Sequence, residues 1–157
     1  DIAKYKQISK TPNNAKLDEC IVDAQLIDIA PLLGEKLFNK IMAAPEDYQD
    51  LLNGGDYTYS GTAYKNYGLK AVISYFVYAR YKMFGSDIDT PFSSVQKLSD
   101  NSTPTPEATK KTLYNLNRES AMQIWANVKA YLIRTKKPDF NSCKSELRRG
   151  TFKFTKL

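Results

Sequence analysis

One uninterrupted stretch, residues 66–84, constrains the fold more than any other part of the chain, because it contains no proline and few charges. At about 100° per residue, the turn of an α-helix, its uncharged side chains separate into two stripes. The aliphatic stripe comprises Leu69, Val72, Ile73, Phe76, Val77, Met83 and Phe84. The opposite, tyrosine-rich stripe comprises Tyr67, Ala71, Tyr75, Tyr78 and Tyr81. A helix with two uncharged faces is expected to be covered on both sides.

The two stripes predict different neighbours. We expect the aliphatic stripe to face the core of the domain. Tyrosine combines an apolar ring with a polar hydroxyl and is favoured at interfaces. The stripe that carries Tyr75 and Tyr78 therefore contacts either a neighbouring element or a neighbouring subunit. Alternatively, these tyrosines line a second layer of the same core.

The segments before this helix also read as helical. Residues 17–30 begin with carboxylates, which suit a helix N-terminus. Pro31 is expected to end or kink that helix and to open a second one over 31–44. A short third helix is expected over 45–52, because Asn-Gly-Gly follows it as a C-terminal cap signal.

The last helix is predicted over 105–134, with Thr105 as a possible N-cap and Pro106 in its first turn. Its length is roughly 45 Å at 1.5 Å per residue. Pro138 blocks further extension. The expected inner stripe has Trp125 at its edge and comprises Leu113, Ala121, Ile124, Val128, Tyr131 and Leu132.

Residues 56–65 are the one convincing β-hairpin in the sequence. Tyr57, Tyr59 and Tyr64 alternate with small polar residues, and Ser60-Gly61 supplies the turn. An isolated two-stranded hairpin is marginally stable in water. We therefore expect it to rest on the helical body or on a partner.

The remaining segments are expected to be arms and connections. Residues 1–16 are predicted to form an extended N-terminal arm. The long connection 86–105 is expected either to reach a neighbour or to be a surface loop, and the stretch from Phe92 to residue 98 favours a short strand at a sheet edge. In the basic tail, residues 136–157, the alternation over 151–157 predicts a strand. That strand pairs either with the hairpin or with another chain.

These segments together predict a mainly α fold: a helical bundle of about four to five helices with a small tyrosine-rich β-hairpin and extended terminal arms. The length of 157 residues suits one domain, which we place at residues 17–135. No apolar run approaches the ~20 residues that a membrane span needs, so no membrane partner is expected. No secretion signal is recognisable.

The composition argues against several kinds of catalytic site. Histidine is absent, which removes Ser–His–Asp and Cys–His arrangements and the commonest metal ligand. Phosphate-binding motifs of the GxxxxGK[ST] or GxGxxG type are also absent. Cys20 and Cys143 match no metal-binding spacing; we expect two buried or half-buried thiols, with a disulfide as the alternative. No catalytic residue, metal or cofactor is therefore predicted.

The excess of positive charge is confined to the C-terminal end. Residues 134–157 hold eight basic and two acidic side chains, whereas residues 1–133 hold fifteen of each. Arg148 and Arg149 lie in this tail. The tail suits an acidic protein partner or DNA; alternatively, its charges keep a terminal strand soluble and discourage unwanted edge pairing.

Two long segments resemble a known group of proteins. IVDAQLIDIAPLLGEKLFNKI (residues 21–41) is similar to the opening helices of the head–tail connector, or adaptor, proteins of tailed phages. LLNGGDYTYSGTAYKNYGLKAVISYFVYARYKMFGSDIDTPFSSVQK (residues 51–97) resembles the ring proteins of phages that infect Bacteroidetes, including crAss-like phages. The shared pattern is a Gly-Gly turn, a short tyrosine-rich hairpin, a helix ending in a YARY-like sequence, and a Thr-Pro-rich loop. With the long last helix, the resemblance covers residues 17–135.

The resemblance implies a structural virion protein rather than an enzyme. Such a protomer joins others, commonly twelve, in a ring below the portal protein, where the ring extends the channel for genomic DNA and docks tail components. The implied location is the head–tail junction of the virion, after synthesis in the host cytoplasm. The alternative is a nucleic-acid-binding accessory protein that acts through its basic tail. The residues expected to contact other subunits or partners are Tyr57, Tyr59, Tyr64, Tyr75, Tyr78, Phe92, Arg148, Arg149, Phe152 and Phe154.

Overall fold

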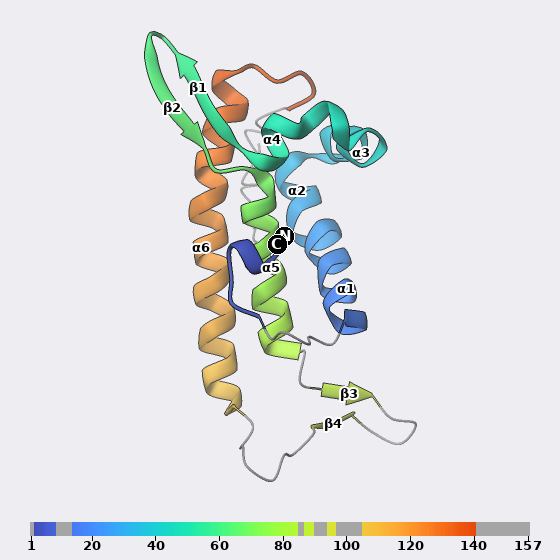
Figure 1. Ribbon diagram of the computed structural model, residues 1–157. Helices are drawn as coiled ribbons and strands as arrows, with labels where there is room; N and C mark the ends of the chain where they lie inside the picture. The colour runs from blue at the N-terminus through green and yellow to red at the C-terminus, as the bar shows by residue number, and fades with distance from the viewer. Residues whose placement is uncertain (1, 9–13, 85–86, 90–93, 97–104, 141–157) are drawn as a thin grey trace, which may run out of the picture.

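The structure is a computed structural model that describes residues 2–8, 14–84, 87–89, 94–96 and 105–140. It is mainly helical, as predicted, with a two-stranded antiparallel hairpin at one end (Figure 1). Helix α5 (Leu69–Phe84) lies in the middle, between α6 (Glu107–Arg134) on one side and the N-terminal helices on the other. The predicted strand over 151–157 lies outside the described residues.

The first helical run passes through Pro31 without ending. Helix α1 (Asn14–Asp23) continues into a wider π-helical turn, η2 (Ala24–Ile29), and then into α2 (Ala30–Leu33). Pro31 lies in the first turn of α2, as predicted, where its missing N–H costs little. The predicted extent of that helix, 31–44, is wrong, because α2 ends at Leu33. The break falls at Gly34, whose φ of +80° suits glycine.

After Gly34 the chain forms α3 (Glu35–Ala43), a 3₁₀ turn η3 (Pro45–Tyr48) and α4 (Gln49–Asn53). The hairpin follows as β1 (Gly55–Tyr59) and β2 (Thr62–Asn66), with the predicted Ser60-Gly61 turn. Gly68 connects the hairpin to α5 at φ +83°, and a Cβ atom there would lie 2.6 Å from the backbone of Asn53. Glycine is thus required at this crossing of two chain segments.

The core forms where α5 meets its neighbours. Four of the predicted aliphatic residues, Leu69, Val72, Phe76 and Val77, are at most 2% exposed. Phe84, at the end of the same predicted stripe, is instead 43% exposed, because it lies at the last residue of α5. The aliphatic side of the helix therefore faces the core as expected, except at its C-terminal end.

The buried stripe of α6 differs from the predicted one. Leu113 is 38% exposed, whereas Trp125, which was expected at the edge, is 5% exposed. Two polar residues, Lys110 and Asn117, are also buried on this helix, and the Asn117 amide donates a hydrogen bond to the Leu113 carbonyl one turn earlier, at 2.6 Å. Because that bond satisfies its amide, asparagine can occupy a buried position on a face where periodicity alone predicts apolar side chains.

The N-terminal residues lie on the body instead of extending away from it. Ile2–Lys4 form a 3₁₀ turn, η1, and Ile2 is buried in the core. Of the connection after α5, the described parts are β3 (Asp87–Asp89) and β4 (Ser94–Gln96), which pair with each other in a separate two-stranded sheet. A strand within 92–98 therefore exists, but its described partner is not the hairpin. None of the helices in the described ranges is long and apolar enough to span a bilayer.

Candidate interaction surfaces

The hairpin is fixed to the C-terminal end of α6 by aromatic rings and one arginine. Tyr57 and Tyr64 face each other across the strands, and their rings stack with centroids 5.7 Å apart. Tyr57 also meets the ring of Tyr131 edge-on at 5.0 Å. The guanidinium of Arg134 lies 3.9 Å from the Tyr64 ring centroid, and its Nη1 donates to the Tyr57 hydroxyl at 3.0 Å. The hairpin thus rests on the body, one of the two predicted alternatives.

Backbone contacts fix the base of the hairpin as well. The side chain of Asn127 on α6 donates to the Lys65 carbonyl and accepts from the Tyr67 N–H, both at 3.0 Å. Asn66 at the end of β2 is buried, and its Nδ2 donates to the Asp50 carbonyl on α4 at 2.9 Å. The hairpin is therefore held from two sides.

The far end of the hairpin remains open to solvent. The strands project beyond the helices (Figure 1), and the turn residues Ser60 and Gly61 are exposed. Tyr59 is 44% exposed, with Arg134 5.9 Å from its ring centroid. In a two-stranded sheet each strand keeps one unpaired edge, and such edges pair readily with further strands.

Two tyrosines of the predicted stripe, Tyr75 and Tyr78, contact the chain's own N-terminal residues. We call residues 2–8 the N-terminal strap. Its Lys6 places Nζ 3.9 Å from the Tyr75 ring centroid and 5.3 Å from that of Tyr78, a cation–π arrangement. Partial burial of its ammonium group lowers the pKa of Lys6. Tyr75 and Tyr78 remain half-buried, so they contact a neighbouring element of this chain and still present part of their surface.

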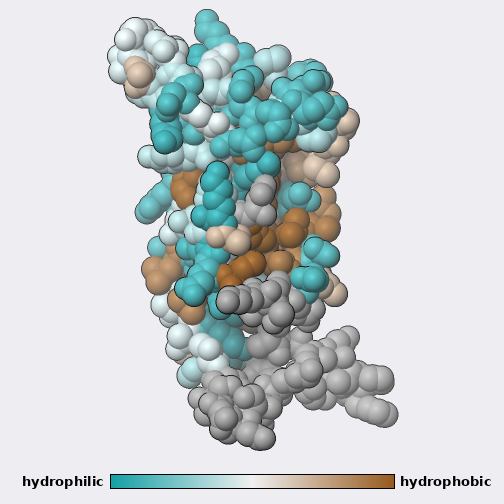
Figure 2. All heavy atoms as spheres, in the orientation of Figure 1, coloured by the Kyte–Doolittle hydropathy of each residue, from teal (hydrophilic) through white to brown (hydrophobic). Residues whose placement is uncertain are grey.

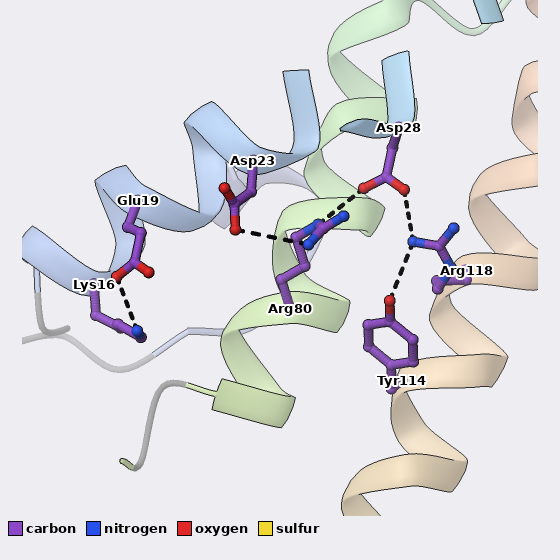
Figure 3. A network of polar contacts seen from close by, with 7 residues as sticks. All are labelled: Lys16, Glu19, Asp23, Asp28, Arg80, Tyr114 and Arg118. Atoms are coloured by element: carbon purple, nitrogen blue, oxygen red, sulfur yellow. Dashed lines mark hydrogen bonds and ion pairs between the residues drawn. The ribbon is translucent and has the colours of Figure 1, made fainter. Parts of the chain in front are cut away.

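A buried ionic network joins three helical segments (Figure 3). The Asp28 side chain, in the π turn, is 2% exposed. It accepts from Arg80 Nε on α5 at 2.9 Å and from Arg118 Nη1 on α6 at 2.6 Å. Arg80 also lies 3.7 Å from the carboxylate of Asp23, and Arg118 reaches the Tyr114 hydroxyl at 3.3 Å. The network ties α5 and α6 to the first helical run.

Sequence reasoning missed this network. Asp28 is flanked by Ile27 and Ile29, and Arg80 stands in an otherwise largely uncharged helix. A charged residue within an apolar stretch indicates a buried ion pair, because charged side chains are almost never fully buried unless they are paired. What the sequence does not reveal is the partner, since Arg118 lies 90 residues from Asp28.

A further feature is an open apolar groove beside the strap, with a cavity volume of about 560 Å³. Figure 2 shows apolar surface gathered in this middle part of the molecule, between α5 and α1. Leu17 and Ile21 on α1, Phe38 on α3 and Ile73 on α5 form its walls. Ile2 and Ile8 of the strap contribute the remaining side. The groove was not predicted from the sequence.

The predicted contact residues therefore fall into three sets. Tyr57, Tyr59 and Tyr64 come together around Arg134, a residue missing from the prediction. Tyr75 and Tyr78 lie together on α5 under Lys6. The third set lies outside the described residues and comprises Phe92, Arg148, Arg149, Phe152 and Phe154.

The thiols and possible metal ligands add no further site. Cys20 is buried and free, and burial raises the pKa of its thiol. Cys143 lies outside the described residues. Within the described part of the chain, no three His, Cys, Asp or Glu side chains gather as a metal ion would require.

Comparison with known proteins identifies one family. A family model described as "Family of unknown function (DUF6712)" matches residues 29–149. That match covers α2 to α6 and therefore includes the hairpin, α5 and Arg118. No curated protein and no solved structure matches the chain.

Proposed function

The chain belongs to the DUF6712 family, a family of unknown function, and we propose that it is a structural protein of a phage virion that forms an oligomeric ring at the head–tail junction. In this proposal the ring lies below the portal protein, extends the DNA channel and docks tail components. Its activity is assembly, and it catalyses no reaction. The resemblance of residues 21–41 and 51–97 to connector proteins supplies the specific role.

The observation that supports assembly most directly is the projecting hairpin. Its outer end projects beyond the helices, and residues 59–62 are exposed. Here Arg134 holds the strands, and Asn127 and Asn66 hold the base, while Tyr59 and the strand edges remain exposed. A preorganised element loses little conformational freedom when a partner binds, which favours affinity. Tyrosine is also among the residues enriched at interfaces.

The test is the mass of the assembled protein. Mass photometry and negative-stain electron microscopy of the chain, alone and mixed with the portal of the phage that encodes it, should show rings or portal-dependent multimers. Tyr59→Glu should remove these multimers without lowering Tm, because the side chain is 44% exposed. Thr58→Ser, at the exposed neighbouring position, is the matched control and should assemble normally. A chain that stays monomeric and does not bind the portal would contradict the proposal.

A second candidate is a nucleic-acid-binding accessory protein, favoured by the concentration of positive charge in residues 134–157. Binding of that kind weakens steeply as salt is raised, because phosphate contacts release counterions. Filter binding to duplex DNA at two salt concentrations, with and without residues 138–157, tests it. Weak binding that is unchanged by the truncation would reject this function.

A further inference from the structure

The N-terminal strap is attached to the body through side chains. Its Tyr5 and Lys6 N–H groups both donate to the Ile2 carbonyl at 2.9 Å, so these bonds stay within the strap. Among the described residues, no backbone hydrogen bond joins the strap to a helix of the body. Its anchors are Ile2, which is 9% exposed, Ile8 in the groove, and Lys6 over Tyr75. Such an attachment can be released without breaking any helix or sheet.

The strap leaves the groove underfilled. About 560 Å³ stays open beside Ile2 and Ile8, which lies within the range of volumes typical of ligand pockets. Its floor includes Ile29 and Leu33 from the core, so the apolar lining is continuous with the core. An apolar surface of this kind, left open to water, is typical of an interaction site.

We propose that the occupant of this groove is a second copy of the chain, which seats its own N-terminal strap there and covers the remaining apolar surface with its body. This inference rests on the proposed ring function and names the contact between neighbouring protomers. The strap of a neighbour is chemically identical to the chain's own, so the contacts of Ile2, Lys6 and Ile8 are the same after exchange. The body of the neighbour buries the rest of the groove in addition, and exchange holds the two bodies in the contact that this burial requires.

Chain length limits how the copies are arranged. Residues 9–13 connect Ile8 to Asn14, the first residue of α1, and can span at most about 20 Å. In an exchanged assembly, the start of α1 in one copy therefore lies within that distance of the groove of the next. Protomers exchanging straps must be direct neighbours in close contact.

Cysteine cross-linking distinguishes exchange from intramolecular seating. In a Cys20→Ala, Cys143→Ser background, Gln7→Cys and Lys82→Cys place one thiol on the strap and one on α5, both at exposed positions, and a short bismaleimide joins them. Seating within one chain gives a cross-linked monomer. Exchange around a ring gives a ladder of covalent dimers, trimers and larger species in denaturing gels. Either single-cysteine variant is the matched control, because it cannot extend beyond a dimer.

The cross-linker is added to the same samples whose mass is measured by mass photometry, over a range of protein concentrations and with the portal present. A ladder in the samples that contain multimers supports exchange. Cross-linked monomers alone in samples that contain multimers would overturn exchange and leave the ring function standing. If multimers are absent under every condition, the ring function and the exchange are both overturned. Ile8→Asp should abolish the ladder, whereas Lys4→Asp, at an exposed strap position, should preserve it.

Discussion

Removing Asp28 is the most informative perturbation of this structure, because one carboxylate connects three helical segments. Asp28→Ala deletes the acceptor of both Arg80 and Arg118. Arg80 would remain 10% exposed, with the carboxylate of Asp23 at 3.7 Å as its nearest described ion-pair partner. Arg118 is 35% exposed, so water can hydrate its guanidinium after the change. Most of the lost stability should therefore come from Arg80, whose charge stays buried.

The loss in the free energy of unfolding depends on how deeply the remaining charges are buried. Breaking a buried ion pair by removing one partner costs about 3–5 kcal/mol. Since only Arg80 stays buried, we expect the lower end of that range, about 3 kcal/mol, in the free energy of unfolding. Arg118→Met removes one hydrogen bond to a charged group and should cost about 1.5–3 kcal/mol. Replacing all three residues together by Leu, Met and Met should restore stability close to the wild type, because no uncompensated charge remains.

Urea unfolding followed by circular dichroism gives these free energies. Asp23→Ala is the control, because Asp23 is 44% exposed and its pair with Arg80 is long; it should cost less than about 1 kcal/mol. A double-mutant cycle should couple Asp28 to Arg80 more strongly than to Arg118. The reasoning is refuted if Asp28→Ala costs under about 1 kcal/mol, or if the triple variant is as unstable as the single one.

Three further outcomes are expected. Gly68→Ala should destabilise the protein by about 1–3 kcal/mol, because its φ is +83° and the space is occupied, whereas Gly61→Ala, at φ +77° in open space, should cost less; thermal melting compares them. Hydrogen bonds from Lys36 and Lys40 on α3 lower the pKa of Asp139. The stabilisation from these pairs is therefore present above the ordinary aspartate pKa and is lost as the pH falls through the lower pKa of the folded protein. Acid titration of the stability should show this loss in the wild type and not in Asp139→Asn. Tyr75→Ala or Tyr78→Ala should impair assembly more than folding; early melting with normal assembly would instead assign these tyrosines to ordinary core.

The parts of the fold that were predictable are those determined by local sequence. The alternation of Tyr57 and Tyr64 around Ser60-Gly61 predicts the hairpin and its turn, because both signals lie within ten residues. The period of residues 66–84 likewise predicts the central helix and its buried face. The helix expected over 31–44 is divided at Gly34, because a single glycine within a helical pattern does not by itself indicate whether the helix continues.

The candidate surfaces were predicted only in part, because their partners are distant along the chain. Tyr57 was identified, but its hydrogen-bond donor Arg134 lies 77 residues away. Asp28 and Arg80 are separated by 52 residues, and periodicity within one helix carries no information about contacts between helices. Likewise, the groove is formed by separate elements, each of which shows only an ordinary apolar face.

Two of the side chains that join the hairpin to α6 also define a path for mechanical force. Arg134 holds the strands near the C-terminal end of the helix, and Asn127 holds the base of the hairpin about two turns earlier. A pull on the hairpin tip therefore loads α6 along a helix of roughly 42 Å, and through Arg118 the load reaches Asp28 and the first helical run. In a ring, strain applied at one protomer's hairpin would be shared by its whole helical body instead of unravelling the hairpin alone. Single-molecule pulling from residue 60 should accordingly show one cooperative rupture in the wild type, with an earlier separate hairpin event in Asn127→Ala.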